Sequence, residues 1–377
     1  MKSLTQLFAA ALLAFLLELP AHADGGGSSA FTLYDVHNLV SDGAVTADHT
    51  DPNLVNPWGI VFNPTGPVWI SDNGTGLSTL YDGAGNIVPV VVAIPGGAAP
   101  TGIVFSGTAS GIFTARTPPG FLVTKGAASA AALFLFATEQ GTISGWAPTV
   151  DFANAINVVD NSAAGAIYKG LALSASGTAN LLYATDFHNR RIDVFDDTFH
   201  PVQVSGGFAD SNIPANFAPF GIQAIAGDIY VTYAQQDADK VDDVHGRGLG
   251  FVDAFDPNGN LLERVAIRGV LNAPWGLALA PAGFGQFGGR LLVGNFGDGK
   301  INAFDLAADR WAGVLIGADR HPVQIDGLWG LVFGNGYFGQ PVDTLYFTAG
   351  PHDEANGLYG RITATPGKKG HKDEMND

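Results

Sequence analysis

The residues with the clearest chemical potential stand where short apolar runs end. Six such positions recur along the chain, and they are called the second ring below: Asp72, Glu139, Asp186, Tyr233, Asn295 and Ala349. Calcium takes several hard oxygen ligands, so Asp72, Glu139, Asp186 and Asn295 are candidate metal ligands. The alternative is structural, because Asp and Asn at strand ends accept hydrogen bonds from their own turns.

Another six positions each precede a recurring glycine, as in Asn56-Pro57-Trp58-Gly59-Ile60-Val61. This inner ring consists of Trp58, Thr101, Lys169, Phe220, Trp275 and Trp329. Aromatic faces suit a ring-bearing or cationic ligand. The candidate ligand-binding residues are therefore Trp58, Lys169, Phe220, Trp275, Trp329 and Tyr233. The same aromatic residues are equally suited to fill a central channel as a plug.

Three residues are candidates for catalysis beside these rings. His188, two residues after Asp186, would act as a general base, and Tyr233 would also handle protons. Lys169 would stabilise developing negative charge, pair with a carboxylate or meet an anionic ligand. The sequence contains no G-x-S-x-G, no H-E-x-x-H and no cysteine, so no familiar nucleophile or zinc motif is present.

Two acidic segments are expected near the same positions. The segment Asp237–His245 fails the EF-hand pattern, because Asp242 stands where glycine is needed and Gly248 where glutamate is needed. We expect a solvated loop there, with an irregular calcium loop as the alternative. The segment His352–Glu354 is expected in the equivalent loop of the last repeat, where it would shade the same face.

These positions are set by a phrase that occurs six times, at intervals of 43 to 68 residues. Alternating apolar runs separated by Asn-Gly, Asn-Pro and Asp-Gly turns follow each copy, which is typical of a β-propeller. The prediction is an all-β, six-bladed β-propeller over residues 31–365. The last blade has only three convincing strands, so the N-terminal strand Phe31–Ser41 is expected to close it.

The expected strands are clearest in four blades. Blade one has Gly59–Phe62, Val68–Ser71, Ser78–Tyr81 and Val88–Ile94; blade three has Leu171–Leu173, Leu181–Thr185, Ile192–Phe195 and Val202–Val204; blade five has Leu277–Leu279, Leu291–Gly294, Ile301–Phe304 and Val314–Ile316; blade six has Gly330–Phe333, Thr344–Thr348 and Leu358–Thr363. Insertions are expected in blade two, at Thr108–Ala130, and in blade four, at Gln235–Gly248.

The N-terminal segment predicts export. A lysine, an apolar run and Ala21-His22-Ala23 form a signal peptide over residues 1–23, cleaved after Ala23. A linker over 24–30 and a disordered polar tail over 366–377 complete the organisation. The net charge of −17 argues against nucleic acid and membrane partners. We expect a periplasmic or extracellular monomer with a small molecule or a protein loop as partner.

Some phrases carry a family resemblance. Leu182-Tyr183-Ala184-Thr185-Asp186, followed by Arg191–Asp196, resembles the blades of NHL-type six-bladed propellers. The chain also resembles an uncharacterised family of secreted bacterial propellers, through phrases such as Ala273-Pro274-Trp275-Gly276-Leu277 and Gly294–Gly299. That resemblance implies the fold and the compartment. Gluconolactonase-like propellers place metal ligands just before the ring glycines, where this chain has the inner ring instead.

Two functions remain open at this point. The first is a non-catalytic binding or interaction module for a small ring-bearing or cationic ligand, or a partner loop, at an aromatic and acidic mouth. The second is a cation-dependent hydrolase or lyase acting on a lactone, ester or sugar through the carboxylates of the second ring. No cofactor is required by the first, and calcium is the expected ion for the second.

Overall fold

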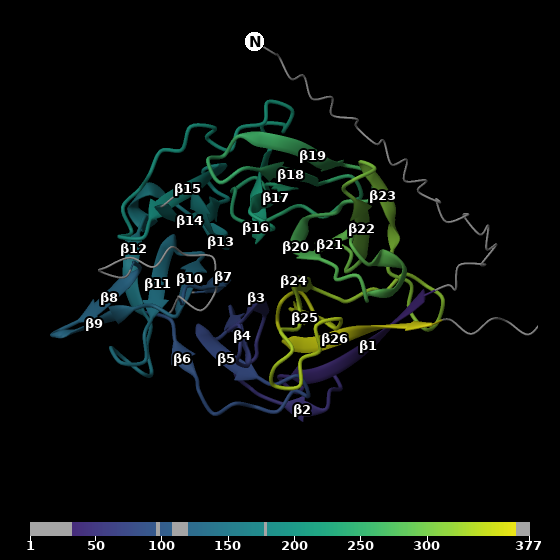
Figure 1. Cartoon of the computed structure of the whole chain (residues 1–377), viewed down its shortest axis with the longest axis horizontal. Coiled ribbons are helices and arrows are strands. Elements are labelled where there is room, and N and C mark those ends of the chain that lie inside the picture. The colour runs from purple at the N-terminus through teal and green to yellow at the C-terminus, as the bar shows by residue number, and fades with distance from the viewer. Residues whose placement is uncertain (1–31, 96–98, 108–119, 177–178, 367–377) are drawn as a thin grey trace, which may run out of the picture. The chain divides into compact units, whose positions relative to one another are not determined.

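Six small β-sheets stand in a ring around one axis, each with its first strand innermost (Figure 1). This computed structural model describes residues 32–95, 99–107, 120–176 and 179–366. Within those ranges the protein is all-β, apart from short 3-10 turns such as η3 (Ser162–Ala164) and η4 (Gly285–Phe287). None of the described segments is a helix long and apolar enough to cross a bilayer. The predicted six-bladed propeller is confirmed.

Each of the first five blades is an antiparallel meander. Blade one contains β3 (Pro57–Phe62), β4 (Val68–Asp72), β5 (Leu77–Tyr81) and β6 (Val92–Ala93). Blade two contains β7 (Pro100–Phe105), β10 (Phe134–Thr138), β11 (Thr142–Trp146) and β12 (Ile156–Asp160). Blade three contains β13 (Tyr168–Ser176), β14 (Ala179–Asp186) and β15 (Arg191–Asp196). Blade four contains β16 (Phe217–Ile225), β17 (Asp228–Gln235), β18 (Phe251–Phe255) and β19 (Leu261–Ile267). Blade five contains β20 (Pro274–Leu279), β21 (Leu291–Asn295), β22 (Ile301–Asp305) and β23 (Arg310–Val314).

The two ends of the described chain share blade six. Its strands β24 (Leu328–Phe333), β25 (Leu345–Ala349) and β26 (Leu358–Pro366) are followed by β1 (Thr32–Ser41) and then β2 (His49–Thr50). β1 runs antiparallel to β26, with Tyr34 opposite Ala364. Tyr34 is buried and packs 5.0 Å from Phe284 of blade five, measured between ring centroids. The predicted closure by the N-terminal strand is therefore confirmed.

A short aspartate turn ends the third strand in several blades. Asp82, Asp196 and Asp256 each accept backbone N–H groups from residues two and four positions ahead, through Oδ1. Such turns satisfy the backbone locally and reverse the chain within a few residues. They explain why Asp-Gly and Asp-Pro phrases separate the strands so regularly.

Three strand predictions need correction. Val202–Val204 does not form a fourth strand in blade three, where an isolated bridge joins Phe195 to Pro201 instead. Pro201 lacks the N–H that a continuing ladder needs. In blade five the fourth strand is β23 rather than Val314–Ile316, because Asp309 turns the chain early with φ 46°. In blade one, β6 covers only two residues of Val88–Ile94.

The blade-two insertion contains a hairpin of β8 (Leu122–Lys125) and β9 (Ala128–Ala131). Gly126 turns this hairpin with φ 61°, a conformation that favours glycine. Residues 108–119 of the insertion lie outside the described residues, as do the predicted signal peptide, the linker and the tail from residue 367.

The recurring glycine is required where neighbouring inner strands touch. A Cβ atom on Gly221 would lie 2.1 Å from the carbonyl oxygen of Trp275 in the next blade. A Cβ on Gly276 would lie 2.5 Å from the carbonyl oxygen of Trp329. Because such distances are far below van der Waals contact, only glycine lets the blades approach this closely. The glycine therefore recurs in the sequence because neighbouring inner strands come into close contact near the axis.

Candidate functional site

The aromatic residues of the inner ring form a buried plug across the axis. Trp58 stacks on Trp329 with ring centroids 3.6 Å apart, and Phe296 stacks on the other face of Trp329 at 3.8 Å. Trp275 meets both tryptophans edge-on, at 6.1 and 5.8 Å. Trp58, Phe220 and Trp329 are at most 2% exposed. Of the two roles considered for these residues, the structure presents the plug, so Trp58 and Trp329 offer no open face to a ligand.

Lys169, also in the inner ring, lies against this plug as a buried cation. Its Nζ donates hydrogen bonds to Glu139 and to Asp242 Oδ1, the latter at 3.1 Å, and lies 5.1 Å from the centroid of the Trp58 ring. Burial by itself lowers the pKa of Lys169, but Glu139 and Asp242 outweigh burial and hold the pKa above its ordinary value. Lys169 is therefore charged, and its predicted pairing with a carboxylate is present.

A chain of polar side chains continues from this ion pair over the plug. Asn73 donates to Glu139 Oε2 at 3.1 Å, and Asn56 donates to Asn73 Oδ1 at 3.2 Å. Asn56 also donates to Glu354 Oε2 at 2.6 Å and accepts the indole N–H of Trp329 at 3.1 Å. This network defines the mouth face, the end of the ring where inner strands begin and second strands end. Together with the ion pair it connects residues from five blades.

Two members of the second ring serve their own turns. Asp186 Oδ1 accepts the backbone N–H groups of Ile167 and Asn189, both at 3.2 Å. Asn295 donates to the carbonyl of Val270 at 2.9 Å and accepts the N–H of Asn272 at 3.2 Å. These bonds tie the end of each second strand to the loop that enters the first strand. They match the structural alternative given for the second ring.

The remaining second-ring positions have other surroundings. Asp72 is fully buried, and burial raises its pKa well above the usual range, with Thr79 opposing the effect by hydrogen bonding. Tyr233 packs in the apolar cluster between blades three and four, and burial with Asp253 and Asp210 raises its pKa. Ala349 is buried. Glu139 alone of the six faces Lys169.

The candidate metal ligands thus have separate neighbours. Among the described residues, no three His, Cys, Asp or Glu side chains form a group able to hold one metal ion. His188 is half-buried, and its Nδ1 lies 3.2 Å from the carbonyl oxygen of Lys240 in the blade-four insertion. It therefore contacts that insertion and not the plug.

An open acidic pocket of about 400 Å³ lies on the mouth face between blades five and six. Its charged lining residues are His245, Asp298, Asp326, Asp353 and Glu354. Phe296, the outer ring of the aromatic stack, also lines it. Lys300 Nζ lies 3.1 Å from Asp298 Oδ2. Asp326 Oδ2 accepts the backbone N–H of His352 at 2.9 Å. The four carboxylates give this acidic pocket a negative potential beside an aromatic surface.

The loop that supplies two of those carboxylates has an unusual backbone. His352, Asp353 and Glu354 all have positive φ, at 58°, 54° and 64°. Non-glycine residues adopt this conformation at a cost, and such strain concentrates at binding and catalytic sites. Burial raises the pKa of Glu354, with Glu139 adding to the effect, while Asn56 opposes it.

His245 brings the blade-four insertion to the rim of the acidic pocket. Its ring meets Phe296 edge-on at 5.1 Å, and its Nε2 lies 3.2 Å from Asp243 Oδ2. Asp243 raises the pKa of His245, with smaller contributions from Glu354 and Asp353. The segments 237–245 and 352–354, noted in the sequence for their acidity, therefore both reach this face.

Sequence reasoning did not single out Phe296, Asp298 or Asp326 as site residues. Phe296 and Asp298 directly follow the second-ring residue Asn295, and Asp326 stands two residues before the inner strand of blade six. Their place in the sequence could have identified them, because all three lie in loops that the repeat assigns to the mouth face.

Comparison with known proteins gives relatives and a fold. The chain is 33% identical over 348 residues to "Uncharacterized protein L690" of Acanthamoeba polyphaga mimivirus, covering 89% of this chain and 87% of that protein. It is 33% identical over 346 residues to "Uncharacterized protein R648" of the same virus, covering 89% and 82%. No family model matches the chain. Both relatives are viral, so the resemblance to a bacterial family and to NHL-type blades stays a prediction.

Solved structures similar to this one share the propeller fold at low sequence identity. A protein of unknown function from Bacteroides thetaiotaomicron superposes with a TM-score of 0.55 at 11% identity, covering 89% of this chain and 77% of that one. A glucose dehydrogenase superposes with a TM-score of 0.52 at 12% identity, covering 88% and 99%. At such identity the likeness shows the fold alone. By its sequence relatives, the chain belongs to the family that includes proteins L690 and R648 of Acanthamoeba polyphaga mimivirus.

Proposed function

We propose that this protein is a secreted binding module that holds a cationic group in the acidic pocket of its mouth face. The group is an ammonium or guanidinium carried by a small molecule or by a loop of a partner protein. The observation that carries the proposal is the acidic pocket itself, which Asp298, Asp326, Asp353 and Glu354 line together with Phe296. Secretion follows from the predicted signal peptide.

The chemistry of the acidic pocket favours a cation over other ligands. Four carboxylates attract positive charge, and the accessible part of the Phe296 ring adds a small apolar contact for the carbon atoms beside that charge. The net charge of −17 steers cations toward the protein over a longer range. An anionic ligand would have to overcome both effects.

The position of the acidic pocket also favours a binding role over catalysis. Loops of blades four, five and six meet at the acidic pocket, and Glu354 is held by Asn56 of blade one. Recognition needs only such fixed charges and shape. The alternative, a cation-dependent hydrolase or lyase, needs Asp72, Glu139, Asp186 and Asn295 around one ion, and three of these four are buried with other neighbours.

Isothermal titration with spermidine, choline and arginine methyl ester tests the proposal, with glycerol and acetate as uncharged and anionic comparisons. The informative variant is Asp353→Asn, since Asp353 lines the acidic pocket and its side chain makes no hydrogen bond to any residue that the structure describes. The matched control is Asp343→Asn, which removes the same charge from an exposed position outside the acidic pocket.

We expect at least one of the cations to bind, and Asp353→Asn to weaken it about fivefold, as for the loss of about 1 kcal/mol. Asp343→Asn should bind like wild type. Absence of binding by all three cations, or equal affinities in the two variants, would falsify the proposal.

A further inference from the structure

The axis of the propeller is hollow on the far side of the plug from the acidic pocket. A cavity of about 30 Å³ lies beside Trp275 and the ring glycines Gly59, Gly102 and Gly330. A wider pocket of about 210 Å³ follows toward the other end of the inner strands. The two share the lining residues Ile60, Ile103, Leu171, Gln223 and Leu331. Together they are called the channel pocket here.

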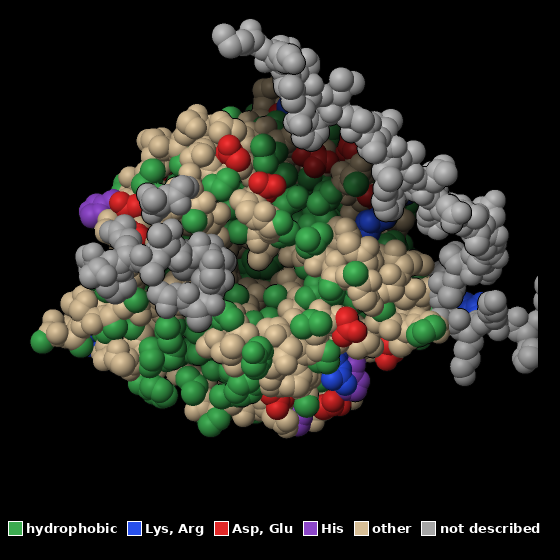
Figure 2. Space-filling view, in the orientation of Figure 1, with side chains coloured by type: hydrophobic (Ala, Val, Ile, Leu, Met, Phe, Trp, Pro, Cys, Tyr) green, Lys and Arg blue, Asp and Glu red, His purple; other side chains and the backbone are tan. Residues whose placement is uncertain are grey.

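The side chains that line the channel pocket are apolar apart from Gln223, and backbone polar groups of the inner strands are exposed between them. The wider part is lined by residues one to three positions after the ring glycine in five of the repeats, among them Val61, Phe105, Leu173, Ala224 and Val332. No charged side chain is among the residues that line either part. Figure 2 shows hydrophobic side chains gathered around the central hollow of the ring. A charged ligand would lose its hydration here without compensation.

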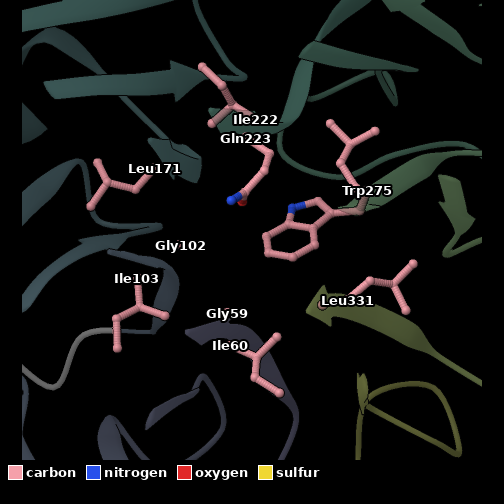
Figure 3. Close-up of a pocket in the computed structure, with 11 residues that line it drawn as sticks. Gly59, Ile60, Gly102, Ile103, Leu171, Ile222, Gln223, Trp275 and Leu331 are labelled. Carbon is pink, nitrogen blue, oxygen red and sulfur yellow. The ribbon is translucent and has the colours of Figure 1, made fainter. Parts of the chain in front are cut away.

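One polar side chain interrupts this surface. Two positions after the ring glycine, the other repeats have Val61, Val104, Ala172, Ala278 and Val332, whereas blade four has Gln223. Gln223 is exposed and points toward the middle of the channel, near the Trp275 ring (Figure 3). Within the described part of the chain its amide makes no side-chain hydrogen bond, so donor and acceptor are free for a ligand.

We propose that the channel pocket binds a small uncharged molecule that has one apolar ring and one hydrogen-bonding group. The ring fits the apolar walls, and a hydroxyl or carbonyl group pairs with the amide of Gln223. A cavity of about 150 Å³ with apolar walls is large enough for benzene. The wider part therefore has room for a six-membered ring with a substituent.

The energetic balance supports this class of ligand. Burying the carbon surface of one ring is favourable, and one well-placed polar group sets the orientation of a ligand in an otherwise apolar site. The plug separates the channel pocket from the acidic pocket, so the two sites are independent. Failure of cation binding at the mouth face would not affect this proposal.

Benzyl alcohol is the probe, with toluene lacking the hydroxyl and benzoate carrying a charge as comparisons. Saturation-transfer NMR and titration on the full chain measure binding to wild type, Gln223→Leu and Ala224→Phe. Ala224→Phe places a ring in the wider part of the channel pocket from a half-buried position. Asp343→Asn, at an exposed position that lines neither the channel pocket nor the acidic pocket, is the matched control.

We expect benzyl alcohol to bind wild type and Asp343→Asn equally, and benzoate to bind neither. Ala224→Phe should reduce the affinity for benzyl alcohol more than tenfold. Gln223→Leu should weaken the binding of benzyl alcohol about fivefold and leave the binding of toluene unchanged. This comparison does not depend on the Ala224→Phe variant, which fills the pocket with a side chain. The proposal fails if benzyl alcohol does not bind wild type. It also fails if Gln223→Leu affects benzyl alcohol and toluene alike, or if folded Ala224→Phe binds like wild type.

Discussion

The indole rings of Trp58 and Trp329 stack 3.6 Å apart between centroids and so join the first repeat to the last at the axis. Trp329 is also stacked by Phe296 on its other face, and its N–H donates to Asn56. The plug therefore closes the ring between the first and last repeats, and it also lies directly beneath the residues of the mouth face. We expect it to contribute strongly to the free energy of unfolding.

Trp329→Ala is expected to lower the free energy of unfolding by about 3–5 kcal/mol, because it opens a cavity within the aromatic stack. Trp311→Ala is the control, since Trp311 is 48% exposed on an outer strand and should cost much less. Urea denaturation followed by circular dichroism measures both. Equal losses in the two variants would show that the plug is not a principal closing contact.

Gly221→Ala tests the contact between inner strands. The added Cβ would lie 2.1 Å from the carbonyl oxygen of Trp275, so the blades must separate. Overpacking of this kind costs about 1–3 kcal/mol, and more where backbone must move. In Gly283→Ala the nearest atom is 3.5 Å away, which is ordinary contact, so its thermal midpoint should stay near that of wild type. A similar midpoint for Gly221→Ala would remove this explanation of the repeat.

Much of the fold could be predicted from the sequence because the ring glycine occurs wherever the backbones of neighbouring inner strands come into contact. Its spacing therefore locates the inner strand of each blade. The phrase around Gly276 located an inner strand, and the missing fourth strand of the last repeat indicated closure by Phe31–Ser41. Strands without such a marker were less predictable. The segment Val202–Val204 has strand-like residues but lacks a continuous ladder beside Pro201.

The site was less predictable because a register shift stands at the inner ring. In blade one the pairing shifts between Pro57 and Ile60, and in blade five between Pro274 and Gly276. Such bulges re-aim side chains, so counting along a strand does not tell which way Trp58 or Trp275 points. The acidic pocket in turn combines loops from three repeats, and its residues share no spacing that periodicity would reveal.

Asp253→Asn should stabilise the protein at neutral and alkaline pH. Burial raises the pKa of Asp253 to about 7, with Asp210 adding to the effect and Arg264 opposing it. The folded state therefore retains a proton that the unfolded chain releases near its ordinary pKa. Stability falls as pH rises from about 4 to about 7, and the loss persists above that range.

The expected gain from Asp253→Asn is about 1–4 kcal/mol at pH 8 and much smaller at pH 4, measured by urea denaturation at both values. Asp343→Asn, at an exposed position, should show no such difference. A gain of equal size at both pH values would mean that packing, and not ionisation of Asp253, is responsible.

Cation binding at the acidic pocket should weaken as pH falls from 8 to 6. Asp243 raises the pKa of His245, and Glu354 and Asp353 add to the shift, so the imidazole gains its positive charge at a higher pH than a free histidine does. The protonated imidazole neutralises part of the negative charge of the pocket's carboxylates and repels an incoming cation. His245→Gln should therefore bind spermidine with little change between pH 8 and 6.

On further acidification both forms should lose affinity, because burial raises the pKa of Glu354 above its ordinary value and its carboxylate becomes neutral at a higher pH than that of a free glutamate. Titrations of wild type and His245→Gln at pH 8, 7, 6 and 5 separate the two groups. His321→Gln, which alters an exposed histidine beside Asp319, should keep the wild-type profile. An unchanged slope in His245→Gln would place the pH response elsewhere. A rise in affinity on acidification would contradict the assigned sign of the pocket's charge.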